Sequence, residues 1–323
     1  MNPNRQCIAI TGASSFIGTH LLERLSRCSD LRFRLLVNRN LNLSLQESKN
    51  ISITQGNLLD SKTLNDFVEP GCIVINLAYL SGRPPEENLA AINNLVEVCS
   101  SAKIRRLIHC STAVVAGRVS TDRVTENTPN KPSHEYEATK SRIEQIILEK
   151  SEGLFETVIL RPTAVFGKGG RNLIKLMEDL RYGNRVVNYM KSCIYQYRRM
   201  NLVYIDNVVS AIEFLIRINR NIGGETFIIS DDEDPSNNYR DIEKYLMMRM
   251  GCKAYSVAPV SVPFPILRFL LRLAGRTNDN PLLVYDCGKI LSSGFKKPLS
   301  FKEGLSRFSD GYIKTHYPDK HHL

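Results

Sequence analysis

Several features that would assign a common functional class are missing from this sequence of 323 residues. No stretch approaches about 18 consecutive apolar residues, so we expect no membrane-spanning segment. The eight cysteines show no CxxC spacing and the six histidines no HExxH spacing, so we expect reduced core cysteines and no metal site. No basic run is interleaved with aromatic residues, so we expect no nucleic-acid partner.

The amino-terminal residues carry no recognisable targeting signal. The chain passes directly into the apolar run Cys7–Ile10, without a basic region, a long apolar stretch and a cleavage site. We therefore predict a cytoplasmic protein. Lysine and arginine exceed aspartate and glutamate by 43 to 33, which gives a net charge of +10. This excess is compatible with an anionic partner such as a nucleotide phosphate, and equally with an ordinary basic surface.

The first half of the chain alternates short apolar runs with helix-like segments, which is typical of βαβ units and a doubly wound parallel sheet. Strands are predicted at 6–11, 32–37, 51–54, 72–77, 105–110 and 156–160. Helices are predicted at 17–28, 61–68, 86–101 and 134–150, with Ser61 and Ser133 as starts of the second and fourth. The alternation loosens after Arg161 and Pro162. Residues 202–205 and 225–229 read as returns to the sheet, so we expect interleaved domains.

A glycine turn follows the first predicted strand. Gly12 permits a tight turn and Gly18 permits close packing of helix on strand. Ser15, Phe16 and Ile17 lead into the helix that begins near residue 17, whose backbone N–H groups would face a pyrophosphate. Taken alone, the same residues also fit a simple turn.

The second predicted strand bears on which dinucleotide binds. No acidic residue stands between Leu31 and Gln46, whereas Arg32, Arg34 and Arg39 are present. An acid in this region usually holds the ribose of NAD, and arginine accommodates the 2′-phosphate of NADP. NADP is therefore favoured and NAD stays open. Arg39, at the strand end, is the better phosphate ligand, because Arg32 and Arg34 also fit a role as solvent-facing strand residues.

Tyr136 and Lys140 lie four residues apart, so a helix would bring phenol and ammonium onto one face. An ammonium near a phenol favours the phenolate and lowers the tyrosine pKa, which predicts an acid/base pair.

The chain contains, in order, the motifs Thr11–Gly18, Gly56–Leu58, Asn76–Ala78, Ser111–Gly117, Tyr136 with Lys140, Leu160–Gly167, Asn201–Asn207, Lys289–Phe295 and Phe301–Leu305. In their order and spacing, these motifs resemble the extended short-chain dehydrogenase/reductase family of nucleotide-sugar epimerases, dehydratases and reductases. The resemblance implies a Rossmann domain over 1–165, with returns near 201–230, and a smaller, mainly substrate-binding region over 166–323. The chain departs from the family pattern at Ser15, where a glycine is usual, at Asn57, where an aspartate is usual, and at Ala116.

The resemblance implies a catalytic triad of Thr112, Tyr136 and Lys140. Thr112 would hold the reacting sugar oxygen, Tyr136 would exchange the proton, and Lys140 would bind the nicotinamide ribose. It further implies Asn57, Leu58 and Ala78 as cofactor contacts. Asn172, Arg198 and Arg199 are implied ligands of the substrate diphosphate, although Arg198 and Arg199 also fit a solvated basic turn.

Within the family, the motifs look most like a subgroup from bacterial polysaccharide biosynthesis. The leading hypothesis is an NADPH-dependent reductase of the 4-keto group of a UDP-linked, N-acetylated, 6-deoxy sugar. An NAD-dependent 4-epimerase of a UDP-sugar or a lipid-linked diphosphate sugar is the alternative, and a non-catalytic cofactor-binding protein is a third. Residues 265–276 place arginines on an apolar helix, which fits peripheral membrane contact or packing on the protein itself. Whether the protein forms a homodimer stays open.

Overall fold

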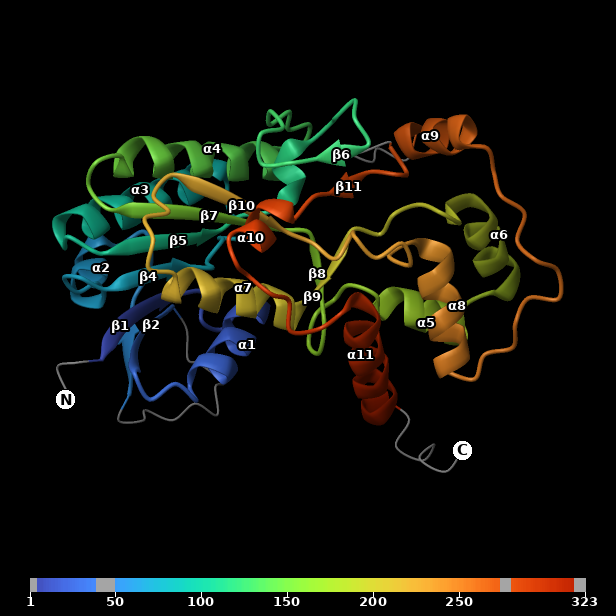
Figure 1. Cartoon of the computed structure of the whole chain (residues 1–323), viewed down its shortest axis with the longest axis horizontal. Helices are drawn as coiled ribbons and strands as arrows, with labels where there is room; N and C mark the ends of the chain where they lie inside the picture. The colour runs from blue at the N-terminus through green and yellow to red at the C-terminus, as the bar shows by residue number, and fades with distance from the viewer. Residues whose placement is uncertain (1–4, 39–49, 274–279, 317–323) are drawn as a thin grey trace. The chain divides into compact units, whose positions relative to one another are not determined.

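The computed structural model describes residues 5–38, 50–273 and 280–316 (Figure 1). By their contacts, the residues form two compact units. The first comprises residues 1–115, 132–161 and 209–227, and the second comprises 116–131, 162–208 and 228–323. Both units are therefore built from separate stretches of the chain. The boundary expected at 165, and the roles assigned to the two regions, stay predictions.

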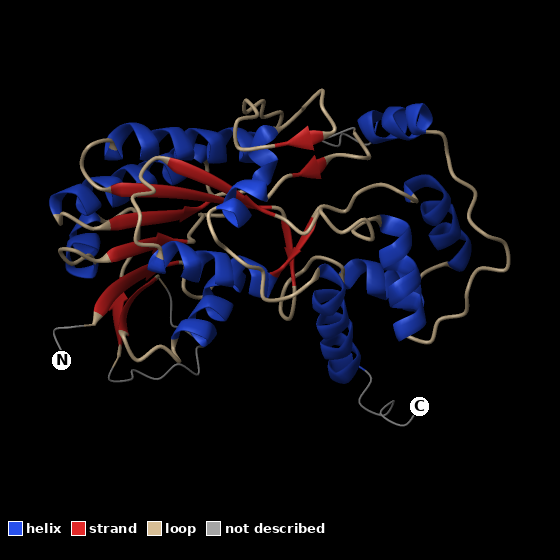
Figure 2. Cartoon of the chain, in the orientation of Figure 1, coloured by secondary structure: helices blue, strands red, loops and turns tan. Residues whose placement is uncertain are grey.

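A seven-stranded sheet forms the centre of the first unit, with the strand order β10-β7-β5-β4-β1-β2-β3 (Figure 2). The strands are β1 (Gln6–Thr11), β2 (Leu31–Val37), β3 (Ile51–Gln55), β4 (Ile73–Asn76), β5 (Arg106–Cys110), β7 (Glu156–Pro162) and β10 (Glu225–Ile229). Neighbouring strands from β3 to β7 pair in parallel. The predicted α/β class with a doubly wound parallel sheet is confirmed.

Helices cover both faces of this sheet. They are α1 (Phe16–Leu25), α2 (Ser61–Phe67), α3 (Pro85–Ser101), α4 (Glu135–Ser151) and α7 (Ile205–Arg217). Helices α2, α3 and α4 lie on one face, and α1 and α7 lie on the other (Figure 1). Residues of β4 and β5 are buried throughout, because a strand covered on both faces has no solvent side.

The strand order reverses between β1 and β4, since β2 lies on one side of β1 and β4 on the other. In open sheets of this kind, ligands bind beyond the carboxyl ends of the strands at such a reversal. Gly12 follows β1 at this edge, and Leu77 and Ala78 follow β4. The sheet topology therefore predicts that a ligand binds beside Gly12, Leu77 and Ala78.

A buried ion pair fixes α4 on the sheet. Arg161 of β7 donates from Nε and Nη2 to the two carboxylate oxygens of Glu144, at 3.0 and 2.6 Å. Both side chains are nearly or fully buried, and removing one partner of such a pair typically costs about 3–5 kcal/mol. Helix α4 carries Tyr136 and Lys140, so this pair helps to set their position.

The second unit contains two short parallel ribbons and a set of helices. The ribbons pair β6 (Arg123–Val124) with β11 (Val284–Tyr285), and β8 (Ala164–Phe166) with β9 (Leu202–Tyr204). The α-helices are α5 (Ile174–Tyr182), α6 (Arg185–Tyr195), α8 (Tyr239–Arg249), α9 (Phe264–Leu273), α10 (Gly288–Ser292) and α11 (Phe301–His316). Within the described ranges, no helix combines the length and apolar composition needed to cross a bilayer.

Two local predictions need correction, and a third is confirmed. The predicted return at 202–205 joins β8 rather than the main sheet, whereas the return at 225–229 is correct. Helix α2 begins at Ser61 as predicted, and the side chain of Asp60 caps it by accepting from the Lys62 N–H. Helix α4 begins at Glu135 rather than near Ser133, whose N–H donates to the Glu137 carboxylate at 2.9 Å.

Candidate active site

The glycine turn after β1 has room for glycine alone at two positions. Gly12 has a φ of +70°, and a Cβ there would lie 2.7 Å from the backbone nitrogen of Ala78. A Cβ on Gly18 would lie 2.4 Å from the Gly12 carbonyl oxygen. Backbone atoms cannot yield as flexible side chains do, so both glycines are required by the close approach of α1, β1 and the residues after β4.

The amino terminus of α1 offers two backbone donors. The Ser15 hydroxyl accepts from the Gly18 N–H at 3.1 Å and caps the helix. No described residue accepts from the N–H groups of Phe16 and Ile17, which lie in the first turn. Donors of this kind, at the positive end of a helix dipole, suit a diphosphate. The turn therefore fits a dinucleotide, and Ser15 serves first as the helix cap.

The two arginines of β2 are already engaged. The Arg34 guanidinium donates to the Glu69 carboxylate at 2.7 Å and to the Phe67 carbonyl at 2.8 Å, and Arg32 also pairs with Glu69. Arg32 and Arg34 are therefore neither simple solvent-facing residues nor free to bind a phosphate. Arg39 lies outside the described residues. Of the three arginines that favoured NADP, only Arg39 keeps that role as a prediction.

Asn57, Leu58 and Ala78, which we expected to contact the cofactor, differ in burial and in their hydrogen bonds. The Asn57 side-chain oxygen accepts from the Leu59 N–H at 3.1 Å, so its amide already shapes the loop after β3. Leu58 is buried in the apolar core, and Ala78 is partly buried beside Gly12. Their contact with a cofactor stays a prediction.

The structure gathers the proposed reacting groups at the carboxyl end of β5. Lys140 is almost fully buried, and its ammonium donates to the Cys110 carbonyl at 3.4 Å. The same ammonium lies 4.8 Å from the centre of the Tyr79 ring. Tyr136 precedes Lys140 by one helical turn and packs edge-on against Tyr79, with ring centres 5.2 Å apart. Thr112 follows Cys110 by two residues.

Burial shifts the pKa values of both members of the acid/base pair. Although 43% of the residue surface stays exposed, desolvation raises the pKa of Tyr136 to about 12, with smaller contributions from Cys110 and Tyr79. Desolvation also lowers the pKa of Lys140. The rise for Tyr136 is the reverse of the lowering that we predicted, because desolvation, rather than the Lys140 charge, dominates.

Lys140 is short of hydrogen-bond acceptors. An ammonium has three donors, yet among the described residues the Cys110 carbonyl is its one hydrogen-bond partner. A buried cation in this condition is costly unless further acceptors approach. The two hydroxyls of a nucleotide ribose are neutral acceptors of suitable size, so the residues present fit a dinucleotide here.

The predicted diphosphate ligands belong to the second unit and are partly committed to its own structure. The Asn172 amide donates to the Val165 carbonyl at 2.7 Å. The Arg199 guanidinium donates to the carbonyls of Asp234 and Pro235 at 3.0 and 3.3 Å, and Arg198 lies 5.8 Å from the centre of the Tyr195 ring. Substrate contact by Asn172, Arg198 and Arg199 stays a prediction.

A family model for the 3-beta hydroxysteroid dehydrogenase/isomerase family matches residues 9–262, which is most of the chain. The chain belongs to this family. The resemblance to extended short-chain dehydrogenases/reductases is confirmed with it, and the protein is an enzyme of the NAD-dependent oxidoreductase, epimerase and dehydratase group. The polysaccharide subgroup stays a prediction.

Individual relatives of this family member are distant. It is 25% identical, over 72% of each chain, to a decarboxylating sterol-4-alpha-carboxylate 3-dehydrogenase from Candida albicans. A UDP-glucuronic acid 4-epimerase from Bacillus cereus, solved with UDP-glucuronic acid and NAD, is 23% identical, with a TM-score of 0.70 and coverage of 97% and 100%. A dTDP-glucose 4,6-dehydratase from Bacillus anthracis, solved with NAD, is 19% identical, with a TM-score of 0.73 and coverage of 96% and 97%. The solved structures show the shared fold.

Sequence reasoning missed a buried polar chain behind the acid/base pair. The Thr11 hydroxyl donates to the Asn76 side-chain oxygen at 2.6 Å, and the Asn76 amide nitrogen lies 3.0 Å from Nδ1 of His109. Since the Asn76 nitrogen is a donor, Nδ1 accepts and Nε2 carries the proton. Nε2 is buried without a partner among the described residues. A histidine within the apolar run 107–110 was the available signal.

This histidine should make stability depend on pH. Burial, aided by the Lys140 charge, holds the pKa of His109 well below 6.5. Below pH 6.5, His109 is therefore protonated in the unfolded chain but stays neutral in the folded chain. Stability is therefore full above about pH 6.5 and falls below it, by up to about 1.4 kcal/mol per pH unit.

His109→Phe is expected to flatten this dependence, while costing about 1–3 kcal/mol at neutral pH because the Asn76 amide loses its acceptor. Urea unfolding of both proteins between pH 5 and pH 8 measures the difference. If the free energy of unfolding changed equally with pH in the two proteins, the role of His109 would be contradicted, since all other titrating groups are shared.

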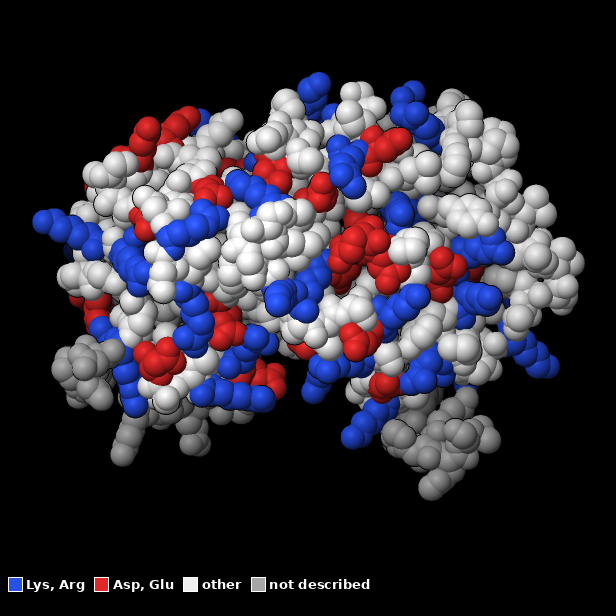
Figure 3. Space-filling model, in the orientation of Figure 1, with Lys and Arg blue, Asp and Glu red and all other residues white. Residues whose placement is uncertain are grey.

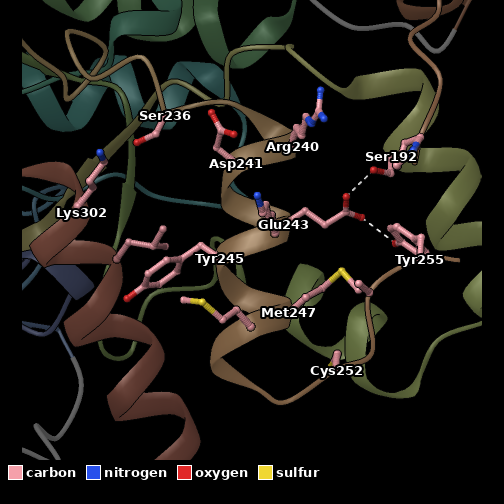
Figure 4. Close-up of a pocket in the computed structure, with 15 residues that line it drawn as sticks. Ser192, Ser236, Arg240, Asp241, Glu243, Tyr245, Met247, Cys252, Tyr255 and Lys302 are labelled. Carbon is pink, nitrogen blue, oxygen red and sulfur yellow. Dashed lines mark hydrogen bonds between the residues drawn. The ribbon is translucent and has the colours of Figure 1, made fainter. Parts of the chain in front are cut away.

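The second unit contains a largely apolar cavity of about 640 Å³ (Figure 4). The Glu243 carboxylate points to its far wall, where it bonds to Ser192 and, at 2.9 Å, to the Tyr255 hydroxyl. Burial raises the pKa of Glu243. The carboxyl group is satisfied by these partners, and the surface that the cavity presents is mainly apolar. No residue of this cavity was predicted from the sequence.

Proposed function

We propose that this protein transfers hydride at carbon 4 of a UDP-linked sugar, with Tyr136 exchanging the proton and Lys140 and Thr112 as its partners. The observation that carries the proposal is the buried Lys140 ammonium, held at the end of β5 one turn after Tyr136 and short of acceptors. A bound nicotinamide dinucleotide supplies the hydride donor or acceptor. The amino terminus of α1 would bind its diphosphate, and Lys140 its ribose.

Tyr136 gives or takes the proton of the reacting oxygen in this proposal. In the reducing direction, its hydroxyl donates a proton to the oxygen of the former ketone, and solvent later restores that proton. Thr112 donates a hydrogen bond to the same oxygen, and Lys140 favours the phenolate that remains. Because burial alone raises the pKa of Tyr136 to about 12, the bound state must provide the compensating positive potential.

The leading form of the proposal is an NADPH-dependent 4-keto reductase acting on an N-acetylated, 6-deoxy UDP-sugar. The acid-free stretch after β2 and Arg39 support it. The second candidate is an NAD-dependent 4-epimerase. The engagement of Arg32 and Arg34 with Glu69 favours this candidate, as do similar folds solved with NAD, including a UDP-glucuronic acid 4-epimerase.

Identifying the dinucleotide that is released when the purified protein is denatured distinguishes the reductase from the epimerase. The reductase predicts little retained cofactor and consumption of NADPH on addition of the UDP-4-keto-6-deoxy sugar. Retained NAD, with interconversion of C4 epimers and no net NADPH consumption, would replace the reductase by the epimerase. A 4-carboxylated 3-hydroxysterol belongs in the substrate panel because of the Candida albicans relative. Turnover of that sterol alone would overturn the sugar proposal.

A further inference from the structure

Helix α9 is apolar on its outward face as well as its inward face. Leu267 and Leu271 are buried, and they anchor the helix. At about 100° of rotation per residue, Phe269 and Leu273 fall on the opposite side, and they are 60% and 70% exposed. A helix on a soluble protein normally presents polar residues there.

The exposed apolar surface continues beyond α9. Ile266 and Leu270 flank the outward face of the helix, and Val257 and Val260 are exposed on the segment that leads into it. That segment lies along α6, since the Val262 N–H donates to the Cys193 carbonyl and the Gln196 amide donates to the Pro259 carbonyl at 2.7 Å. Helix α6 adds a third set of exposed apolar residues. They are Val186, Val187 and Met190.

The charged residues within these segments are of one sign. Neither residues 253–273 nor residues 185–195 contain an aspartate or a glutamate, whereas the two stretches together carry Lys253, Arg268, Arg272, Arg185 and Lys191. Of these, Lys191 is paired with Asp179. In Figure 3 the end of the second unit that carries α6 shows mainly uncharged atoms with basic ones among them.

We propose that this surface, formed by α6, residues 253–262 and α9, binds the face of an anionic phospholipid bilayer. Exposed Phe and Leu side chains would enter the boundary between headgroups and acyl chains, while Arg268 and Arg272 lie beside lipid phosphates, which is the pattern of interfacial helices. The acid-free composition selects this occupant over a second copy of the chain, because two such basic surfaces would repel each other.

The absence of tryptophan from the chain permits a direct test. Phe269→Trp places a single reporter on the outward face of α9. Leu154→Trp is the matched control, because Leu154 is similarly exposed, at 58%, but lies in the first unit. With vesicles of phosphatidylcholine and phosphatidylglycerol, the emission of Phe269→Trp is expected to shift to the blue and that of Leu154→Trp to stay unchanged.

Co-sedimentation with the same vesicles supplies the second measurement. Phe269→Ser and Arg268→Gln are each expected to weaken binding, the former by at least about tenfold because it removes a large apolar contact, and Leu154→Ser is expected to bind as the unmodified protein does. High salt should weaken binding, and vesicles of phosphatidylcholine alone should bind less.

Two results would overturn the proposal. One is the absence of binding to anionic vesicles at low salt with no shift in the Phe269→Trp emission. The other is a blue shift that appears without vesicles as protein concentration rises, which would assign the surface to self-association. Neither measurement requires turnover, so the proposal stands or falls independently of the proposed reaction.

Discussion

Replacing Tyr136 with phenylalanine is expected to lower kcat by about 10²–10⁴-fold, the range over which a positioned proton donor contributes. The phenol lies one helical turn before the buried Lys140 on α4, and phenylalanine keeps the ring that packs on Tyr79. The fold and the binding of dinucleotide should therefore persist. Steady-state kinetics with the substrate found in the panel, together with a dinucleotide titration, measures both properties.

Tyr79→Phe provides the comparison variant. It makes the same chemical change on the ring that packs against Tyr136 and lies under the Lys140 ammonium, yet it keeps both ring contacts. We expect it to retain most of the activity. Equal losses in the two variants would show that the polar environment, rather than proton transfer by Tyr136, is responsible. Full activity of Tyr136→Phe would remove the proposed mechanism.

Gly18→Ala is expected to reduce the free energy of unfolding by about 2–4 kcal/mol and to abolish dinucleotide binding. The new methyl group would lie 2.4 Å from the Gly12 carbonyl oxygen and 2.7 Å from that of Ala13. Relief requires α1 to move away from β1, which displaces the N–H groups of Phe16 and Ile17. Urea unfolding and a fluorescence titration with NADH and NADPH measure the two effects.

Gly311→Ala is the matched control for this change. Gly311 lies within α11, and a Cβ there meets no heavy atom within 4 Å. Alanine is a better helix former than glycine by about 1 kcal/mol, so this variant is expected to be as stable as the unmodified protein or slightly more stable. A Gly18→Ala protein that unfolds and binds dinucleotide normally would show that the turn tolerates the displacement.

Local patterns predicted the main sheet well, for a physical reason. Buried parallel strands need continuous apolar runs, and the helices between them need amphipathic spacing, so both properties are visible within a few residues of sequence. The same reasoning failed at 202–205, where a strand pairs with β8 outside the main sheet. Strand partners are set by long-range packing, which an apolar run of this length does not specify.

The sequence predicted which residues of the candidate site lie together better than it predicted their pKa values and ion pairs. The short spacing of Tyr136 and Lys140 on a helix is a local property, and the structure does gather them at the end of β5. The rise in the pKa of Tyr136 depends first on burial and then on the electrostatic effects of Cys110 and Tyr79, which come from other parts of the chain. In the same way, the pairing of Arg32 and Arg34 with Glu69 joins residues more than thirty positions apart.

The buried cysteine beside the acid/base pair has a practical consequence for redox chemistry. Desolvation raises the pKa of Cys110 to about 11, so at pH 7 roughly one molecule in ten thousand carries the reactive thiolate. Burial raises the pKa of Cys72 likewise, to about 11. Peroxides and alkylating reagents attack thiolates, so Cys110 and Cys72 should react slowly in the folded enzyme, and rapid modification of Cys110 would serve as a reporter of unfolding.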